Sequence, residues 1–201
     1  MKFAYIVFFI SIAIWLFPAI RQYKTNLFYF FLILALEDPA VSIVTLLLDI
    51  LDPTLVHSIA SMLLFYSIDF NLDNIKKNWI LNVILVVCFF IGLLVIDNNF
   101  FLIIIIHTLI LGKFIKYIVI RLHNKSETNL FYLVLIFYEL TILVNLIVFL
   151  SENNIGYMLH YITLAFQFLI AIFFTVFRVD NPILVRSLRS SIWNIIFSSN
   201  F

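Results

Sequence analysis

The sequence predicts an all-α, polytopic integral membrane protein with seven transmembrane helices. Three observations lead to this fold class. The chain has 201 residues, 65% of them hydrophobic and 11% charged, and its mean hydropathy is +1.16, far above that of a soluble domain. Apolar runs long enough to cross about 30 Å of hydrocarbon recur along the whole chain. In addition, one stretch of the first half occurs again in the second half.

The repeated stretch covers residues 25–60 and 128–163, which align without a gap. Both copies begin with Thr-Asn-Leu-Phe-Tyr. The same displacement of 103 positions pairs Asp49 with Glu152 and His57 with His160. Because polar matches are rare in so apolar a chain, we interpret the pattern as an internal duplication.

Each predicted helix is an apolar run bounded by polar residues. The runs are 3–20, 26–48, 53–69, 79–96, 99–120, 129–151 and 155–177. The predicted organisation is a seven-helix domain at 1–178, made of repeat A at 1–69, a connector helix at 79–96 and repeat B at 99–178, followed by a tail at 179–201. We expect the first run to be retained, because no small-x-small cleavage site follows it.

The basic residues predict the orientation. Eleven of the twelve Lys and Arg fall on one side of the predicted bundle, and Lys2 is the exception. The amino terminus is then outside and the carboxyl terminus cytoplasmic, so that the two triplets of helices run parallel and the connector helix inverts the chain between them. Without an organellar signal, a bacterial cytoplasmic (inner) membrane is the simplest location.

The tail is predicted to be an amphipathic helix on the cytoplasmic membrane surface. Asp180 and Asn181 offer a cap and Pro182 a first-turn proline. Leu184, Leu188, Ile192 and Ile196 then recur at every fourth position. Residues 182–201 are therefore a candidate contact for a protein partner. A frayed tail is the alternative.

Two short connections resemble the loops of the PQ-loop and SWEET families of small transporters. These are residues 18–25, Pro-Ala-Ile-Arg-Gln-Tyr-Lys-Thr, and residues 121–128, Arg-Leu-His-Asn-Lys-Ser-Glu-Thr. The family pattern is Pro-Gln, a basic stretch, Lys-Ser and a short polar entry to the next helix. The resemblance implies the same architecture of two parallel three-helix repeats, with an outside amino terminus.

Several ionisable side chains are predicted to lie inside the membrane, where they are expensive and so are functional candidates. Glu37 and Asp38 lie about 16 Å into their helix at ~1.5 Å per residue, and Glu139 is equally deep in the repeat. Pro39 frees a backbone carbonyl beside the two acids. Asn145 shares the inward face predicted for the helix of Glu139. The alternative role for these carboxyl groups is structural, as hydrogen bonds between helices.

Histidines extend this polar seam. His107, midway along its run, would meet Glu37 or Glu139 as a buried acid–base pair, or else be an ordinary core histidine. His57 and His160 form a predicted polar pair near the outer surface, with Gln167 on the same helix as His160. Such a pair could bind a transition metal or sense pH, but the spacing matches no metal motif.

Other classes are excluded or disfavoured. The net charge of +1 and the position of the basic residues at helix ends do not indicate nucleic-acid binding. The lone Cys88 allows no disulfide or zinc set and is expected to be buried packing. No hydrolytic motif is present, and no cofactor is predicted, so the protein is not expected to be an enzyme.

Two functions remain. The first is binding or transport of a small solute, with or without proton coupling, at a midplane seam formed by Glu37, Asp38, Glu139, His107, Asn145 and Gln167. The second is a non-enzymatic sensor or accessory subunit that relays a signal to a partner protein. In both cases the lipid bilayer is the solvent, and an oligomer is compatible with the sequence.

Overall fold

The helices predicted from the sequence are confirmed. The computed structural model describes residues 2–48, 52–68, 79–96, 98–125, 127–150, 155–181 and 184–186. Within these residues the helices are α1 (Lys2–Arg21), α2 (Phe28–Leu48), α3 (Pro53–Ser67), α5 (Trp79–Val95), α6 (Phe100–Lys125), α7 (Leu130–Leu150) and α8 (Ile155–Val176). The strands are β1 (Glu127–Asn129) and β2 (Leu184–Arg186). The largest difference from prediction is at the end of α6, which continues five residues beyond Ile120.

Three helices begin with the same local device, which explains why sequence placed their starts so well. A side-chain oxygen of Asp or Asn accepts the backbone N–H two residues further along, at a helix end where the first N–H groups have no intrahelical partner. The pairs are Asp52 with Thr54 (2.9 Å), Asn98 with Phe100 (3.0 Å) and Asn129 with Phe131 (2.9 Å). Pro53 additionally occupies the first turn of α3, where its missing N–H costs nothing.

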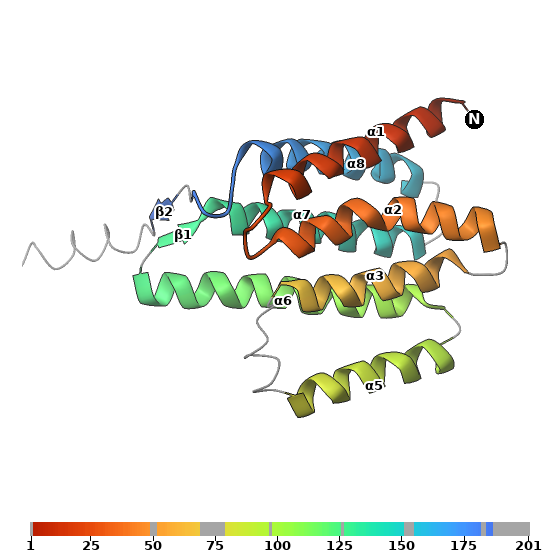
Figure 1. The fold of residues 1–201 in the computed structure, drawn as a ribbon, viewed down its shortest axis with the longest axis horizontal. Coiled ribbons are helices and arrows are strands. Elements are labelled where there is room, and N and C mark those ends of the chain that lie inside the picture. The colour runs from red at the N-terminus through yellow and green to blue at the C-terminus, as the bar shows by residue number, and fades with distance from the viewer. Residues whose placement is uncertain are drawn as a thin grey trace, which may run out of the picture.

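The helices lie side by side along the long axis of the molecule, and successive helices run in opposite directions (Figure 1). We call the end at which α1, α3, α6 and α8 finish the basic end, because Arg21, Arg121 and Arg178 lie there. We call the opposite end, where Asp52 begins α3, the acidic end.

Six helices form a closed ring. Going around it, α1 packs against α2, α2 against α3, α3 against α6, α6 against α7, α7 against α8, and α8 against α1. The fourth helix in the chain, α5, lies outside this ring and packs against α6 (Figure 1). Each of the first three helices therefore lies across the ring from one of the last three: α1 from α6, α2 from α7 and α3 from α8.

An aromatic cluster fills the ring toward its basic end. Phe31 of α2, Phe131 of α7 and Phe174 of α8 meet with ring centroids 4.9–6.0 Å apart, and each is at most 2% exposed. Phe30 contacts Phe114 of α6 edge to face at 5.7 Å. Aromatic pairs at these separations add stability beyond the burial of their surface. The cluster closes the centre of the ring between the basic end and the polar side chains described below.

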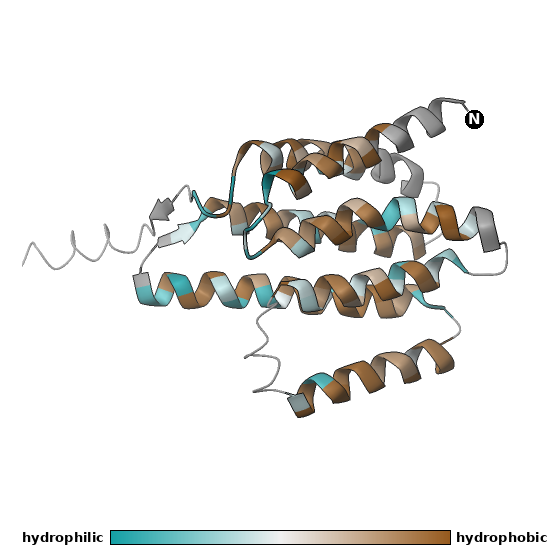
Figure 2. Cartoon of the chain, in the orientation of Figure 1, coloured by the Kyte–Doolittle hydropathy of each residue, from teal (hydrophilic) through white to brown (hydrophobic). Residues whose placement is uncertain are grey.

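The outer surface is strongly apolar. Figure 2 shows that hydrophobic residues occupy most of each helix, with hydrophilic residues gathered mainly at the ends and in the connections. Leu94 is 88% exposed, Ile20 70% and Phe149 66%. Among the residues that the structure describes, three helical segments are long and apolar enough to cross a membrane, namely Phe28–Thr45, Phe100–Asn124 and Leu130–Leu150. Three shorter apolar segments, Ile12–Arg21, Trp79–Val95 and Ile162–Val176, accompany them.

Two sequence-based expectations need correction. Cys88 is exposed rather than buried, because α5 stands outside the ring. The tail is not helical at its start, since residues 184–186 form β2, which pairs antiparallel with β1. The chain before α7 offers an unpaired edge at this point, so backbone pairing replaces the helix predicted from Pro182 onward. Residues 187–201, which carry most of the predicted amphipathic pattern, lie outside the described residues.

Candidate functional site

A carboxyl group and a histidine are buried together between α6 and α7. His107 Nδ1 lies 2.8 Å from Glu139 Oε2, and their side chains are 5% and 0% exposed. The second carboxyl oxygen, Oε1 of Glu139, is buried without a hydrogen-bond partner in the described part of the chain. The structure thus forms the acid–base pair that the sequence predicted for His107, with Glu139 rather than Glu37 as the partner.

A second pair of the same kind joins α2 and α3. His57 Nδ1 lies 2.7 Å from Glu37 Oε1, and the two side chains are 33% and 15% exposed. The sequence grouped His57 with His160 instead. The side chain of His160 lies outside the described residues, so that grouping stays a prediction. Because α3 packs between α2 and α6, His57 reaches the carboxyl group of its neighbouring helix.

Ser61 connects the two pairs. It lies one turn after His57 on α3, and its hydroxyl donates to the carbonyl oxygen of His57 at 2.8 Å. The same oxygen lies 3.2 Å from His107 Nε2. Glu37, His57, Ser61, His107 and Glu139 therefore form one continuous chain of contacts across four helices. We call these five residues the His–Glu chain.

The contacts determine where protons reside in the inner pair. Ser61 uses its single proton toward the His57 carbonyl, so its oxygen acts as acceptor toward His107, and Nε2 must carry a hydrogen. One further proton must then lie between Nδ1 of His107 and Oε2 of Glu139. The pair is therefore either a neutral imidazole with a carboxylic acid or an imidazolium with a carboxylate, and its net charge is zero in both forms.

The inner pair of the His–Glu chain is more deeply buried than the outer pair. The side chains of His57 and Glu37 are 33% and 15% exposed, whereas those of His107 and Glu139 are 5% and 0% exposed. Glu37 lies at the middle of α2, and His57 lies in the first turns of α3, toward the acidic end. The carboxyl and imidazole groups can each hold or release a proton, and Ser61, which contacts the backbone carbonyl of His57 and Nε2 of His107, links the outer pair to the inner pair.

Three other residues predicted for the site are half-buried. Asp38 is half-buried beside Glu37, and Pro39 follows it inside α2, where it leaves the carbonyl of Ala35 without its usual helical donor. Asn145 on α7 and Gln167 on α8 are also half-buried.

Two buried aromatic residues pack together in the core, Trp15 of α1 and Tyr138 of α7, the residue before Glu139. Their rings lie 5.0 Å apart, and each residue is at most 7% exposed.

Sequence reasoning missed a second polar centre, at the basic end. Gln22 is fully buried, and its amide nitrogen donates to the carbonyl oxygens of Phe174 (3.1 Å) and Phe177 (2.7 Å). Its amide oxygen accepts from the N–H of Val179 at 3.2 Å. One side chain at the end of α1 thus satisfies three backbone groups at the end of α8. The signal in the sequence was the uncharged amide of Gln22 beside the cations Arg21 and Lys24. The loop pattern gave this amide no separate role.

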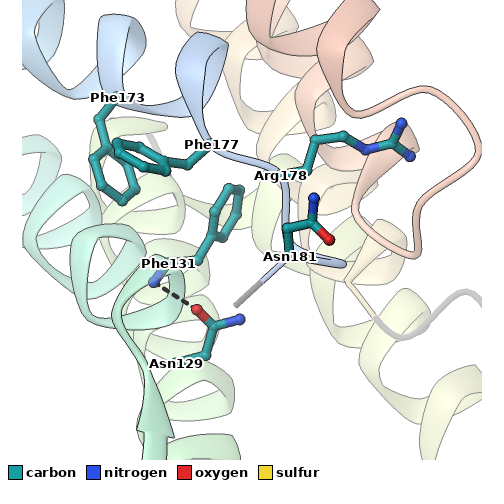
Figure 3. Close-up of a pocket in the computed structure, with 6 residues that line it drawn as sticks. All are labelled: Asn129, Phe131, Phe173, Phe177, Arg178 and Asn181. Carbon is teal, nitrogen blue, oxygen red and sulfur yellow. Dashed lines mark hydrogen bonds between the residues drawn. The ribbon is translucent and has the colours of Figure 1, made fainter. Parts of the chain in front are cut away.

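Asn129 performs a similar role nearby. Its oxygen accepts the N–H of Phe131, and its nitrogen donates to the Val179 carbonyl at 3.4 Å. Figure 3 shows the shallow depression between Asn129, Phe131, Phe173, Phe177, Arg178 and Asn181. It is too narrow to admit a water molecule, so the contact between the start of α7 and the end of α8 is a packed junction rather than a ligand site.

The described residues contain no group of three or more His, Cys, Asp or Glu side chains placed to hold a metal ion. Comparison with protein-family models, with curated proteins and with solved structures gave no match for this chain.

Proposed function

We propose that this chain is a multi-pass membrane protein that exchanges protons through the His–Glu chain and couples this exchange to the movement of a small solute. The observation that carries the proposal is the buried Glu139–His107 pair, which holds a shared proton and is connected by Ser61 to the more exposed His57–Glu37 pair. Ionisable groups enclosed among membrane-spanning helices are expensive, and proton relays are a common reason for their presence.

Seven spanning helices are part of the proposal. The seven helices lie side by side, and their outward faces are apolar (Figures 1 and 2). Eleven of the twelve Lys and Arg are placed by the sequence toward the basic end. This supports a cytoplasmic basic end and an outside amino terminus, with the bacterial inner membrane as the simplest host.

The duplication is also part of the proposal. The order of packing around the ring is unchanged when α1, α2 and α3 are exchanged with α6, α7 and α8. A two-fold axis along the membrane normal has this property, and parallel repeats with an inverting connector are known in transporters. The similarity of the two loops to PQ-loop and SWEET proteins implies the same plan.

The proposed route begins at the acidic end. In the proposed step the inner pair has first lost a proton, so that Nε2 of His107 is bare. The Ser61 hydroxyl then turns from the His57 carbonyl and gives its proton to Nε2, while Nδ1 of His107 passes its own proton to Glu139. The imidazolium of His57, whose ring must turn toward Ser61, restores the proton of that hydroxyl. The aromatic cluster of Phe31, Phe131 and Phe174 closes the other side of the ring. Passage of a solute would require α2, α7 and α8 to part at this cluster, and Pro39 provides α2 with a site for bending.

The test is uptake by proteoliposomes, with a pH-sensitive dye inside and sugars and amino acids as solutes. The Glu37→Gln/Glu139→Gln double variant should lose proton-coupled uptake while remaining folded. Asp180→Asn is the matched control, because it makes the same chemical change at an exposed residue of the basic end. Undiminished uptake by the double variant would refute the role assigned to the His–Glu chain.

A second candidate function is a proton-responsive sensor or accessory subunit. The close packing of the inner pair, with 5% and 0% exposure, favours a protein whose helices shift when a proton binds without any solute passing. We propose that such a protein contacts its partner through the tail.

Deleting residues 182–201 should then abolish co-purification of the partner. A shorter deletion, of residues 190–201, keeps the β2 strand and serves as the control. Retention of the full partner set after the longer deletion would contradict the docking role of the tail.

A further inference from the structure

A cavity of about 530 Å³ lies between α5 and the ring, away from the His–Glu chain. This is within the size range of pockets that hold small molecules. Five segments contribute to it, from the start of α2 to the start of α7. Its lining residues include Ile68, Leu81 and Leu85 on the apolar side, and Asn82, Tyr117 and Tyr132 on the polar side.

The cavity arises from the way in which α5 packs. Near the acidic end α5 and α6 are in close contact, because a Cβ atom placed on Gly92 would lie 2.7 Å from Leu102. Phe89 is the buried residue of α5. Toward the basic end the two helices separate (Figure 1), and the cavity begins there, between Leu85 of α5 and Phe114 of α6.

The charge on the cavity wall is positive. Of the described residues that line it, the charged ones are Lys113 and Lys116, which lie about one turn apart on α6. Lys113 Nζ donates to the carbonyl oxygen of Phe65 at 2.8 Å and lies 3.7 Å from the centre of the Phe65 ring. These contacts hold its ammonium group at the cavity wall. Lys116 is exposed.

A third cation stands beside the wall. Arg121 donates to the hydroxyl of Tyr117 at 3.2 Å, and Tyr117 in turn stacks on Tyr132 with ring centroids 4.0 Å apart. The Nε of Arg121 is buried without a hydrogen-bond partner among the described residues. The helix α6, with 26 residues, is about 39 Å long at 1.5 Å per residue, which exceeds the hydrocarbon thickness. Its last turns, including Arg121, therefore reach the headgroup layer.

We propose that this cavity binds the headgroup and first acyl-chain segment of an anionic phospholipid. Two lysines suit a phosphate group, and the apolar side chains of Ile68, Leu81 and Leu85 in the same wall suit the first segment of an acyl chain. Basic pockets between helices on the cytoplasmic side are where anionic lipids bind. The inference rests on the membrane location and orientation proposed above, but not on proton exchange.

The experiment is native mass spectrometry of the detergent-solubilised full chain, titrated with phosphatidylglycerol or with phosphatidylcholine. Two variants test the cavity. Lys116→Gln removes a positive charge from its wall, and Leu85→Trp fills its volume with a larger side chain. Lys24→Gln is the matched control, because Lys24 is an exposed cation of the basic end that does not line the cavity. Recovery of the protein in detergent micelles tests the membrane location separately.

Wild type and Lys24→Gln should retain phosphatidylglycerol in preference to phosphatidylcholine. Lys116→Gln should bind it about five-fold more weakly, which is the usual effect of one basic side chain near an anionic lipid surface. Leu85→Trp should lose the bound lipid. Equal retention of the two lipids, unchanged binding by both cavity variants, or displacement of the lipid by millimolar glycerol phosphate would each overturn the proposal, the last because the occupant would then be a soluble anion.

Discussion

The substitution His107→Leu isolates a buried carboxyl group. It removes the 2.8 Å contact to Oε2 of Glu139, whose other oxygen already lacks a partner in the described residues. Leucine is close to histidine in volume, so little of the cost comes from a cavity. Breaking a buried pair by removing one member costs about 3–5 kcal/mol, because the remaining group is left uncompensated. We expect a loss of about 3 kcal/mol in the free energy of unfolding.

Removing both members should reverse most of this loss. Replacing a buried pair with apolar residues of similar volume is often neutral or stabilising. We therefore expect His107→Leu/Glu139→Leu to lie within about 1 kcal/mol of the wild type. The measurement is a double-mutant cycle of unfolding free energies in bilayer-mimicking micelles. The equivalent cycle at His57 and Glu37 should give at most about 1 kcal/mol of coupling, since that pair is partly exposed and screened.

A strictly additive cycle at His107 and Glu139, with each single variant costing less than about 1 kcal/mol, would refute the reasoning. It would mean that the imidazole of His107 and the carboxyl group of Glu139 each find another hydrogen-bond partner when the other is removed. A coupling energy of about 0.6–1.7 kcal/mol is what a single interhelical hydrogen bond supplies in a membrane. A larger value would indicate that separated charge contributes to the pair.

Two further predictions use features at the acidic end and on α6. Gly92→Ala should weaken the packing of α5 against α6 by about 1 kcal/mol, because the new methyl group would lie 2.7 Å from the side chain of Leu102. Gly112→Ala should instead stabilise α6 by about 0.5–1 kcal/mol, because no atom lies within 4 Å of the added methyl group and alanine favours the helix. Free energies of unfolding of the two variants test both expectations. Hydrogen bonds from Thr54 hold the pKa of Asp52 below its ordinary value of 3.8, so the cap stabilises α3 fully above that pH and loses its effect as pH falls through the lowered pKa. Amide exchange at the start of α3 should therefore accelerate on acidification in the wild type and not in Asp52→Asn.

The positions of the helices could be predicted from the sequence because residues close together in the chain cap the helix ends. Two apolar runs are each followed by a side chain that caps the next helix. These side chains are Asp52, which Pro53 follows, at α3, and Asn98 at α6. Sequence reasoning also found Glu139 and His107, since a charged or titratable residue in the middle of an apolar run needs a partner wherever the helix packs. Both inferences depend on residues close together in the chain or on a single energetic rule.

The rest of the site could not be predicted because it depends on how neighbouring helices are rotated. The polar residues Thr54, His57, Ser58 and Ser61 share one face of α3, but this pattern does not show which neighbouring helix the face meets. His57 therefore had no visible preference for Glu37 over a partner in the other half of the chain. Similarly, the strand at 184–186 follows from an unpaired backbone edge before α7, which an every-fourth-residue pattern does not reveal.

The junction made by Gln22 has a consequence for biosynthesis. Gln22 is separated from its acceptor Phe174 by 152 positions in the sequence. At roughly 5–20 residues per second, the ribosome needs on the order of 8–30 s to produce that partner after Gln22 itself. During this interval the amide has no acceptor from α8, and α1 lacks one of its two neighbours in the ring. A chain that stops before α8 therefore leaves the amide of Gln22 without these backbone partners and one face of α1 uncovered, so that the ring is completed only when the last helix packs.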